Sequence, residues 1–225
     1  MEILKFSDLS QGGFAGLKER RFVTDRRVFG SSVDDKVFDG LGNFVYLADA
    51  NFMPKGETGM HGHKEIDVIS VMVEGSVSHA GSLEHGQSLE SGAAQVQRAG
   101  AEGFKHNEIN PNDTQNHMIQ LWVTPDEAGE AAGYKMYQPK AGEVTHIYGG
   151  PKEQDDTFYS ATSISVANPV TGQTIKQVGT VMAYLSRGEG EINGQAVDAR
   201  TLVRSEEGIE FVAQADSQLI LIYLT

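Results

Sequence analysis

The chain has 225 residues, of which 39% are hydrophobic, so it is long enough to bury either one large core or two compact ones. Acidic residues outnumber basic residues by 31 to 18, and the formal net charge of -13 argues against direct binding of nucleic acid or of an anionic membrane surface. Because the chain has no cysteine, disulfides, thiolate metal sites and cysteine nucleophiles are excluded.

The N-terminal segment lacks the basic stretch and the apolar run of a secretory signal. No stretch approaches the about 20 apolar residues that a membrane-spanning helix needs. We therefore expect a soluble, cytoplasmic protein. A basic cluster near the N-terminus is expected to be a solvated face, with the binding of an acidic partner as the alternative; it comprises Lys18, Arg20, Arg21, Arg26 and Arg27.

Short apolar runs rich in Val and Ile recur between clusters of Gly, Asn and Asp, which is typical of short strands joined by tight turns. The clearest predicted strands are residues 44–48, 68–73, 118–123, 181–185 and 218–224. Helical periodicity is nearly absent, and only residues 125–132, which begin with a proline, are expected to form a short helix. The predicted fold class is therefore all-β, with sandwich or barrel domains and at most short helices.

A short internal repeat suggests two similar halves. The segment VISVMVEG at residues 68–75 has the same outline as VMAYLSRG at residues 181–188, and the two copies lie about half the chain apart. In the second copy, an Asn-Gly pair at residues 193–194 predicts a hairpin turn. Residues 134–160, which contain two prolines, are the expected crossover between the halves. We therefore predict an N-terminal domain over residues 1–133 and a C-terminal domain over residues 134–225.

Two pairs of potential metal ligands have strand spacing. His61 and His63 form one pair, and His106 and Glu108 form the other. Residues two apart in a strand point to the same face, and both pairs are expected to face an apolar interior. An interior His or Glu without a partner is costly, and a bound metal removes that cost. Neighbouring strands lie about 4.8 Å apart, so two such pairs can surround one centre.

These residues predict one divalent metal ion per chain, held in the N-terminal domain by His61, His63, His106 and Glu108. Three nitrogens and one oxygen favour Fe(II), with Mn, Ni, Co, Cu and Zn as competitors, and leave one or two coordination positions open for water or substrate.

The remaining histidines are expected to lie at the surface or to have ordinary partners; they are His79, His85, His117 and His146. Glu65 and Asp67 share strand parity with His63, so either could orient a metal ligand from behind, and a surface carboxylate is the commoner explanation for both.

Several motifs together resemble the pirin family of bicupins. They are GMHGHKEID at residues 59–67, VEG at 73–75, HAGS at 79–82, AGAEG at 99–103 and HNE at 106–108. Through LWVTP at residues 121–125 and the segment 134–139, the chain looks most like the bacterial pirin-like proteins, some of which act as quercetin 2,3-dioxygenases. The resemblance covers most of the chain and implies two cupin-type domains. The iron ligands of the family fall on the four residues that strand parity selects, His61, His63, His106 and Glu108.

The sequence departs from the family pattern in the first half. Asp67 stands where the family has glutamate, and Gly62 stands where it has a proline between the two histidines. Residues 90–94 replace a Pro-Gly-Asp turn, which changes the expected shape of that wall.

The second half lacks the ligand pattern. The repeat places Thr174 and Lys176 where His61 and His63 stand in the first half, and neither residue suits a soft divalent metal. No histidine follows His146. We therefore expect a C-terminal cupin without metal that supports packing.

The resemblance implies a dioxygenase whose substrates are dioxygen and a small aromatic molecule, a flavonol such as quercetin. Glu108 would then take the hydroxyl proton of the flavonol as general base. The alternative is a redox- or metal-sensing regulatory binding protein that acts through a protein partner, as is proposed for eukaryotic pirins. In a third interpretation the metal only stabilises a sandwich, and an open coordination position would count against it.

Overall fold

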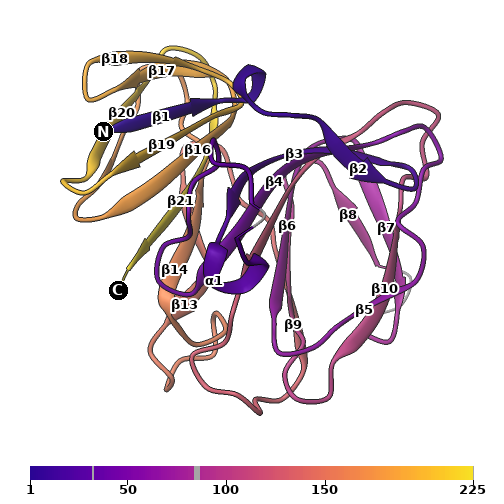
Figure 1. Ribbon diagram of the computed structural model, residues 1–225. Helices are drawn as coiled ribbons and strands as arrows, with labels where there is room; N and C mark the ends of the chain where they lie inside the picture. Colours follow the sequence, from indigo (N-terminus) through magenta and orange to yellow (C-terminus); the bar gives the residue numbers. More distant parts are fainter. Residues whose placement is uncertain (32, 84–86, 225) are drawn as a thin grey trace. The chain divides into compact units, whose positions relative to one another are not determined.

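The computed structural model of the chain describes residues 1–31, 33–83 and 87–224. In these residues the regular structure is almost entirely β-strand, with one short 3-10 helix, η1 (Phe6–Asp8), and one short α-helix, α1 (Arg26–Phe29) (Figure 1). This confirms the predicted all-β fold class. No helix of the described residues is long and apolar enough to cross a membrane.

The chain divides into two compact units. One consists of Leu9–Gln138, and the other consists of Met1–Asp8 together with Pro139–Thr225. We call them the N-terminal unit and the C-terminal unit.

The N-terminal unit contains two antiparallel sheets. Its strands are β2 (Gly12–Phe14), β3 (Leu17–Thr24), β4 (Phe44–Phe52), β5 (His61–His63), β6 (Asp67–Glu74), β7 (Ser76–Gly81), β8 (Ser88–Glu90), β9 (Ala94–Arg98), β10 (Phe104–Ile109), β11 (His117–Val123) and β12 (Gly133–Tyr137). The larger sheet has the strand order β12-β9-β6-β11-β4-β3-β2, and the smaller has the order β5-β10-β7-β8. Figure 1 shows strands β3, β4, β6 and β9 on one side of this unit and strands β5, β7, β8 and β10 on the other.

The two sheets of the N-terminal unit enclose an apolar core at one end. Met72 and Met118 from the larger sheet pack with Val77 and Leu89 from the smaller sheet, and none of the four side chains is more than 1% exposed. Burying such a side chain contributes about 1.5–3 kcal/mol. Burial of these apolar side chains therefore stabilises the strands around this core without any contribution from polar groups.

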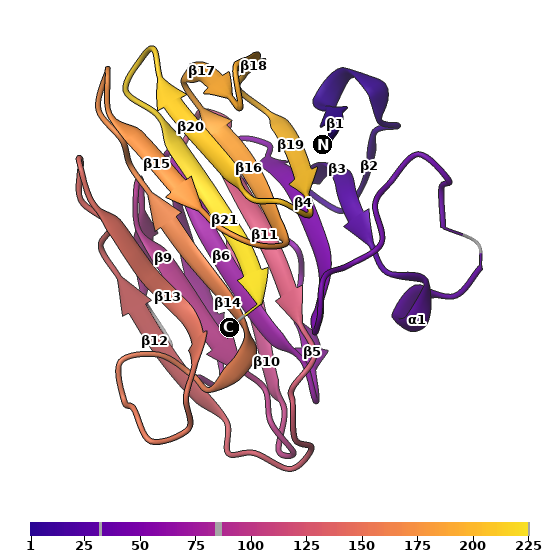
Figure 2. The ribbon, with the colours of Figure 1, turned by 90° about the vertical axis from the view of Figure 1, so that its left-hand side faces the viewer.

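The C-terminal unit also contains two antiparallel sheets. Its strands are β1 (Glu2–Lys5), β13 (Val144–Gly150), β14 (Ser160–Ala167), β15 (Thr174–Gln177), β16 (Val181–Arg187), β17 (Glu189–Ile192), β18 (Gln195–Asp198), β19 (Thr201–Ser205), β20 (Ile209–Ala213) and β21 (Gln218–Leu224). The strand orders are β1-β19-β16-β21-β14-β13 and β15-β20-β17-β18. Figure 2 shows β14, β16 and β21 running alongside one another in the larger sheet.

The five strands predicted most clearly are confirmed as β4, β6, β11, β16 and β21. The repeat also corresponds to equivalent structure, because β6 and β16 are each followed by a glycine in a left-handed conformation, Gly75 with φ 77° and Gly188 with φ 92°. The predicted hairpin turn joins β17 to β18, and both of its central residues have positive φ, 51° at Asn193 and 76° at Gly194. This is the conformation that a two-residue type I′ turn requires.

The predicted short helix over residues 125–132 is wrong. These residues form turns and bends. Gly129 has a φ of 89°, which a right-handed helix cannot accommodate, and its N–H is taken by the side chain of Glu65 at 3.1 Å. The carboxylate of Glu65, which is distant in the sequence, thus accepts the N–H that a backbone carbonyl would accept in a helix.

The two units differ from the expected division at residues 133 and 134. Strand β12 pairs with β9 along its whole length, so the chain leaves the N-terminal unit only after Gln138. Strand β1 pairs with β19, so the first residues of the chain belong to the C-terminal unit. Both differences come from strand pairing between distant segments, which local sequence patterns do not reveal.

A buried ion pair fastens the edge of the larger sheet in the N-terminal unit. Asp67 and Arg98, whose side chains are 1% and 4% exposed, lie opposite each other on β6 and β9 and approach to 2.9 Å. The same guanidinium also binds Glu130. Asp67 is therefore a buried structural residue that pairs with Arg98, and Glu65 binds the loop at Gly129.

We predict that Arg98→Met lowers the free energy of unfolding by about 3–5 kcal/mol, because the carboxylate of Asp67 stays buried without its cationic partner. Urea denaturation measures the loss. The double variant Asp67→Leu/Arg98→Met removes both charges and is the control, and it should recover most of the lost stability. A double variant that is as unstable as Arg98→Met would contradict this explanation.

Candidate metal centre and its cavity

The register between β5 and β10 brings the predicted ligand pairs together. His61 lies opposite His106, and His63 lies opposite Phe104. Along β10, Phe104, His106 and Glu108 are buried while Lys105 is exposed. The side chains two apart therefore point into the N-terminal unit, as the strand spacing predicts.

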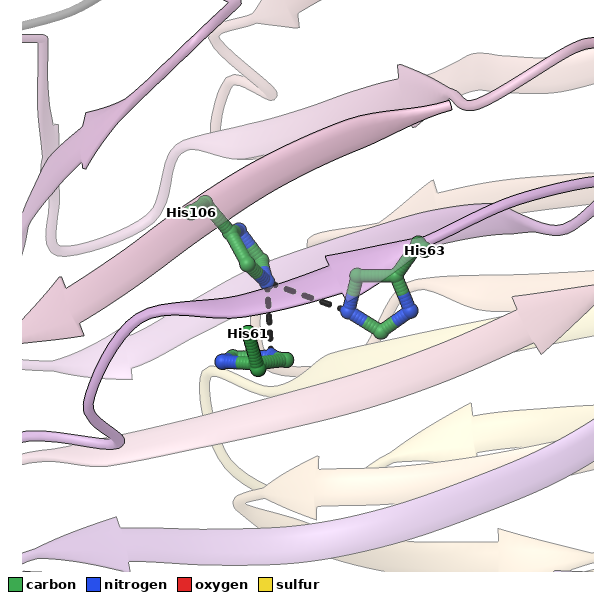
Figure 3. Close-up of side chains that lie close together, drawn as sticks. All are labelled: His61, His63 and His106. Carbon is green, nitrogen blue, oxygen red and sulfur yellow. Dashed lines mark hydrogen bonds between the residues drawn. The ribbon is translucent and has the colours of Figure 1, made fainter. Parts of the chain in front are cut away.

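Three imidazole nitrogens converge on one point. The Nε2 atom of His106 lies 3.0 Å from Nε2 of His61 and 3.1 Å from Nε2 of His63 (Figure 3). The potential ligand atoms of these three residues all lie within 4.8 Å of one another. Two neighbouring strands thus supply three nitrogens to one small volume.

The protonation of these histidines leaves lone pairs toward that point. The Nδ1 atom of His61 lies 2.9 Å from the carbonyl oxygen of Gly59, which can only accept, so the neutral ring carries its proton on Nδ1 and a lone pair on Nε2. Burial, followed by the neighbouring His61, lowers the pKa of His63 to about 4. Burial, followed by the surrounding imidazoles, lowers the pKa of His106 to about 2. The rings of His63 and His106 are therefore neutral at physiological pH, which is the state that binds a metal.

This donor set fits a divalent metal ion. Lone pairs that face one another at such distances repel unless a proton or a cation lies between them. Three neutral imidazole nitrogens are ligands for Fe, Ni, Cu and Zn, and they leave coordination positions for other groups. His61, His63 and His106 could therefore hold one ion.

Glu108 lies close to the histidine cluster but has different partners. Its carboxylate accepts hydrogen bonds from Ser70 and from Gln120, each at 3.3 Å. Burial raises the pKa of Glu108 to about 7, although these two hydrogen bonds act in the opposite direction. The described cluster within 4.8 Å contains the three histidines and not Glu108. The structure thus brings Glu108 to the wall of the same cavity without placing its oxygens among the converging nitrogens.

The cavity beside the histidines has a volume of about 130 Å³. It is lined by Phe14, Glu19, Arg21, Phe29, Tyr46, Thr58, His61, His63, Glu108, Gln120 and Trp122. Imidazoles and Glu108 thus share one small chamber with aromatic side chains.

The aromatic wall is a cluster of three rings in mutual contact. The ring centroid of Trp122 lies 4.5 Å from that of Tyr46 and 6.1 Å from that of Phe29, and the centroids of Phe29 and Tyr46 lie 5.8 Å apart. Trp122 and His63 are in an edge-to-face arrangement with centroids 5.5 Å apart. The cluster therefore reaches from the histidines to Phe29, and its rings offer apolar surfaces against which an aromatic ligand can pack.

The sequence analysis gave His79 no role at this site. Of the two outcomes expected for it, a surface position or ordinary partners, the structure shows a buried histidine with partners. Its Nε2 atom lies 3.1 Å from Nδ1 of His106 and 2.9 Å from Nε2 of Gln97. His79 has the same strand parity as the buried Val77, and that pattern was the available signal. His117 bonds to Asp49 at 3.0 Å.

The same expectation was made for His146 and His85. His146 lies between Ser165 and the carbonyl oxygen of Gly149, so it has ordinary partners, as expected. His85 lies outside the described residues.

His79 and Gln97 favour the form of His106 that can bind a cation. If Nε2 of His106 presents a lone pair, its proton is on Nδ1 and Nε2 of His79 must accept it. The amide nitrogen of Gln97 is a donor that requires a lone pair on the same atom of His79. Both neighbours therefore favour a proton on Nδ1 of His79, and the chain of bonds orients His106 as a ligand.

We predict that His79→Leu lowers the affinity for a divalent metal by about 10- to 100-fold, because the Nδ1–H of His106 loses its acceptor. Competition between the protein and a chelator for nickel measures the affinity. His79→Gln keeps an acceptor oxygen and is the control, with an affinity close to that of the parent. Equal affinities for the Leu variant and the parent would show that His79 has no such role.

The equivalent strands of the C-terminal unit have a different interior. Thr174 and Lys176 are exposed on β15, and Lys176 pairs with Glu210 on β20. The inward residue between them is Ile175, which packs in an apolar cluster with Phe211. The ring of Phe211 lies so close to β17 that a Cβ on Gly190 would meet it at 2.6 Å. Apolar side chains thus fill this interior.

Residues 25–123 match the sequence model of the Pirin family. The chain is 27% identical over 174 residues to a quercetin 2,3-dioxygenase of Escherichia coli K12, a match that covers 72% of this chain and 74% of the relative.

Two solved structures have the same fold. The bacterial pirin YhhW of Escherichia coli in complex with nickel(II) matches with a TM-score of 0.83 and 19% identity over 99% of this chain and 98% of its own. A quercetin 2,3-dioxygenase of Acinetobacter baumannii matches with a TM-score of 0.71 and 19% identity over 99% of this chain and 85% of its own. With the two β-sandwich units, these matches confirm the predicted fold of two cupin-type domains.

Proposed function

We propose that this chain, which carries a pirin domain over residues 25–123, is a metal-dependent dioxygenase that acts on a flavonol-like aromatic substrate with dioxygen. The observation that carries the proposal is the convergence of three imidazole nitrogens, two of which belong to His61 and His63 in the lining of a cavity with an aromatic wall. The similarity to a relative named quercetin 2,3-dioxygenase supports the same reaction class.

We propose that His61, His63, His106 and Glu108 hold one ion per chain, with Fe(II) as the metal. Imidazole and carboxylate ligands suit Fe(II), and the nickel in the YhhW structure shows that the same fold binds another divalent ion in that protein. The C-terminal unit is proposed to hold none, because apolar residues occupy its interior.

The proposal gives a role to Glu108 and to four side chains around it. An ion held by these residues would supply Lewis acidity, which would lower the pKa of a substrate hydroxyl group beside it. Glu108 accepts the proton of that hydroxyl, and Ser70 and Gln120 hold its carboxylate in place. Trp122 and Tyr46 pack against the aromatic ring and exclude water.

The first test is metal content. We predict that His61→Ala and His106→Ala each lose the ion while the protein stays folded, because the apolar cores of both units do not involve these side chains. Elemental analysis of protein purified without chelator should give one ion per parent chain. His146→Ala removes a histidine outside the cluster and should keep that ion. Full occupancy in both cluster variants would overturn the ligand assignment, and two ions per chain would overturn the proposal for the C-terminal unit.

The second test separates catalysis from binding. We predict that Glu108→Gln keeps much of the metal, since three imidazoles remain, and lowers quercetin turnover by about 10²- to 10⁴-fold, the usual cost of losing a general base. Oxygen uptake and metal content are measured on the same sample. Glu102→Gln changes an exposed carboxyl outside the cavity and should leave both unchanged.

Unchanged turnover in a Glu108→Gln protein that retains its metal would rule out the base. If the parent protein took up no oxygen with any of the metals, the regulatory alternative, a metal-sensing protein with a protein partner, would be favoured.

A further inference from the structure

Two cavities of the N-terminal unit share the side chains of Arg21 and Phe29. The first is the chamber beside the histidines, with a volume of about 130 Å³. The second has a volume of about 480 Å³, and Leu9, Gly12 and Val37 are among its other lining residues. Arg21 and Phe29 line both, so they stand at the boundary between them.

The first cavity is too small for a flavonol. Pockets for ligands of that size have volumes of about 300–1,000 Å³. A volume of about 130 Å³ is below this range, whereas the second cavity, at about 480 Å³, lies within it. A ligand that places one ring beside the histidines must therefore extend the rest of its structure elsewhere.

Aromatic contacts connect the histidines to the boundary between the two cavities. Trp122 contacts His63 and also Phe29, and Phe29 is itself a lining residue of the second cavity. A planar molecule with several rings could follow this wall from one cavity to the other, because each step offers an aromatic face or edge.

Arg21 is held at the boundary in a fixed orientation. Its Nε and Nη2 atoms bind Oε1 of Glu19 at 2.8 and 2.7 Å, and the other oxygen of that carboxylate accepts from the hydroxyl of Tyr46 at 2.9 Å. Glu19 is buried, whereas the side chain of Arg21 is half exposed. A guanidinium has five N–H donors, so donors remain beyond the two atoms that Glu19 binds.

The ion pair of Arg21 and Glu19 at the boundary between the cavities favours one class of ligand group. Glu19 balances the charge of Arg21, so the boundary suits a phenol or phenolate oxygen better than a multiply charged group such as phosphate. The matching ligand has a metal-chelating oxygen pair at one end and a hydroxylated aromatic ring at the other.

We propose that the substrate site spans both cavities, with its chelating ring beside the histidines and its far ring past Phe29 in the second cavity, and that Arg21 selects a far ring that carries a hydroxyl group. This extension rests on the function proposed above. Arg21 is then a specificity-determining residue whose loss weakens the binding of a flavonol far more than that of a one-ring chelator.

The fluorescence of Trp122 can report ligand binding directly. Trp122 is its single tryptophan and lies in the wall of the first cavity. Quenching of its fluorescence can be followed in nickel-loaded protein without oxygen, so that binding is measured apart from turnover. Free N-acetyltryptophanamide corrects for absorption by the ligands. The two probes are quercetin, which has a far hydroxylated ring, and 2-methyl-3-hydroxy-4-pyranone, which has the chelating ring alone.

Two variants address the second cavity independently. Arg21→Leu removes the guanidinium, and its dissociation constant for quercetin should rise about 10- to 100-fold, which corresponds to the loss of a hydrogen bond from a charged group. Gly12→Phe keeps both Arg21 and Glu19 in the chain and narrows the second cavity, and a Cβ at this position meets Glu19 at 3.9 Å, which is ordinary van der Waals contact. It should weaken quercetin binding about 10-fold. Neither change should alter pyranone binding by more than about twofold, because the pyranone has no far ring to place in the second cavity or to present a hydroxyl group to Arg21.

Lys18→Leu is the matched control. It removes one positive charge from an exposed position on the same strand, outside the linings of both cavities, and should change neither affinity. The melting temperature of each variant shows whether it is folded, and Gly12→Phe decides the result if Arg21→Leu is unstable.

The outcomes separate this inference from the proposed function. Pyranone and quercetin binding in the parent, with a selective loss of quercetin in the variants, supports the two-cavity site. Unchanged quercetin affinity in folded variants, an equal loss for both ligands, or parent protein that binds only the pyranone would overturn it and leave the metal centre standing. Parent protein that binds neither ligand would overturn the proposed function together with its extension.

Discussion

The antiparallel pairing of β5 with β10 sets His61 opposite His106, and the whole candidate site depends on this register. A slip of one residue would turn both histidines of β5 to the other face, because side chains alternate along a strand. The register is constrained from the other side as well. Gly81 of β7 lies so close to β10 that a Cβ there would meet the carbonyl oxygen of Lys105 at 2.4 Å, which leaves room only for glycine.

The larger sheet supplies the support that the buried polar groups need. Ser70 on β6, Gln97 on β9 and Gln120 on β11 are all buried, and each bonds to Glu108 or to His79. A buried polar group costs free energy unless it is hydrogen-bonded. These three side chains of the larger sheet supply hydrogen bonds to Glu108 and His79, which lie on the smaller sheet beside the histidine cluster. In the C-terminal unit the corresponding space is packed with apolar side chains. Two sandwiches of one architecture thus differ in their interiors: the N-terminal unit has a polar patch beside a cavity, and the C-terminal unit has apolar packing in the corresponding space.

Local patterns predicted the strands well, since runs of β-branched residues ended by glycine are a strong signal, as in β6 before Gly75 and β16 before Gly188. They failed where a distant partner decided the outcome. The segment 125–132 has the composition of a short helix, but it is held as turns by Glu65. His79 shares strand parity with Val77, which is compatible with burial, but its contact with His106 depends on the pairing of β7 with β10.

By itself the sequence determined the all-β class and the inward direction of His61, His63, His106 and Glu108, because period-two alternation is a local property of a strand. It also selected the Asn-Gly turn between β17 and β18, which needs only positive φ at two adjacent residues. The tertiary structure alone decided which strands are neighbours, that Gln97 and His79 stand behind His106, and that Arg21 and Phe29 separate two cavities. These features come from contacts between segments far apart in the chain, whose pairing depends on the packing of the whole sandwich and leaves no periodic trace in the sequence.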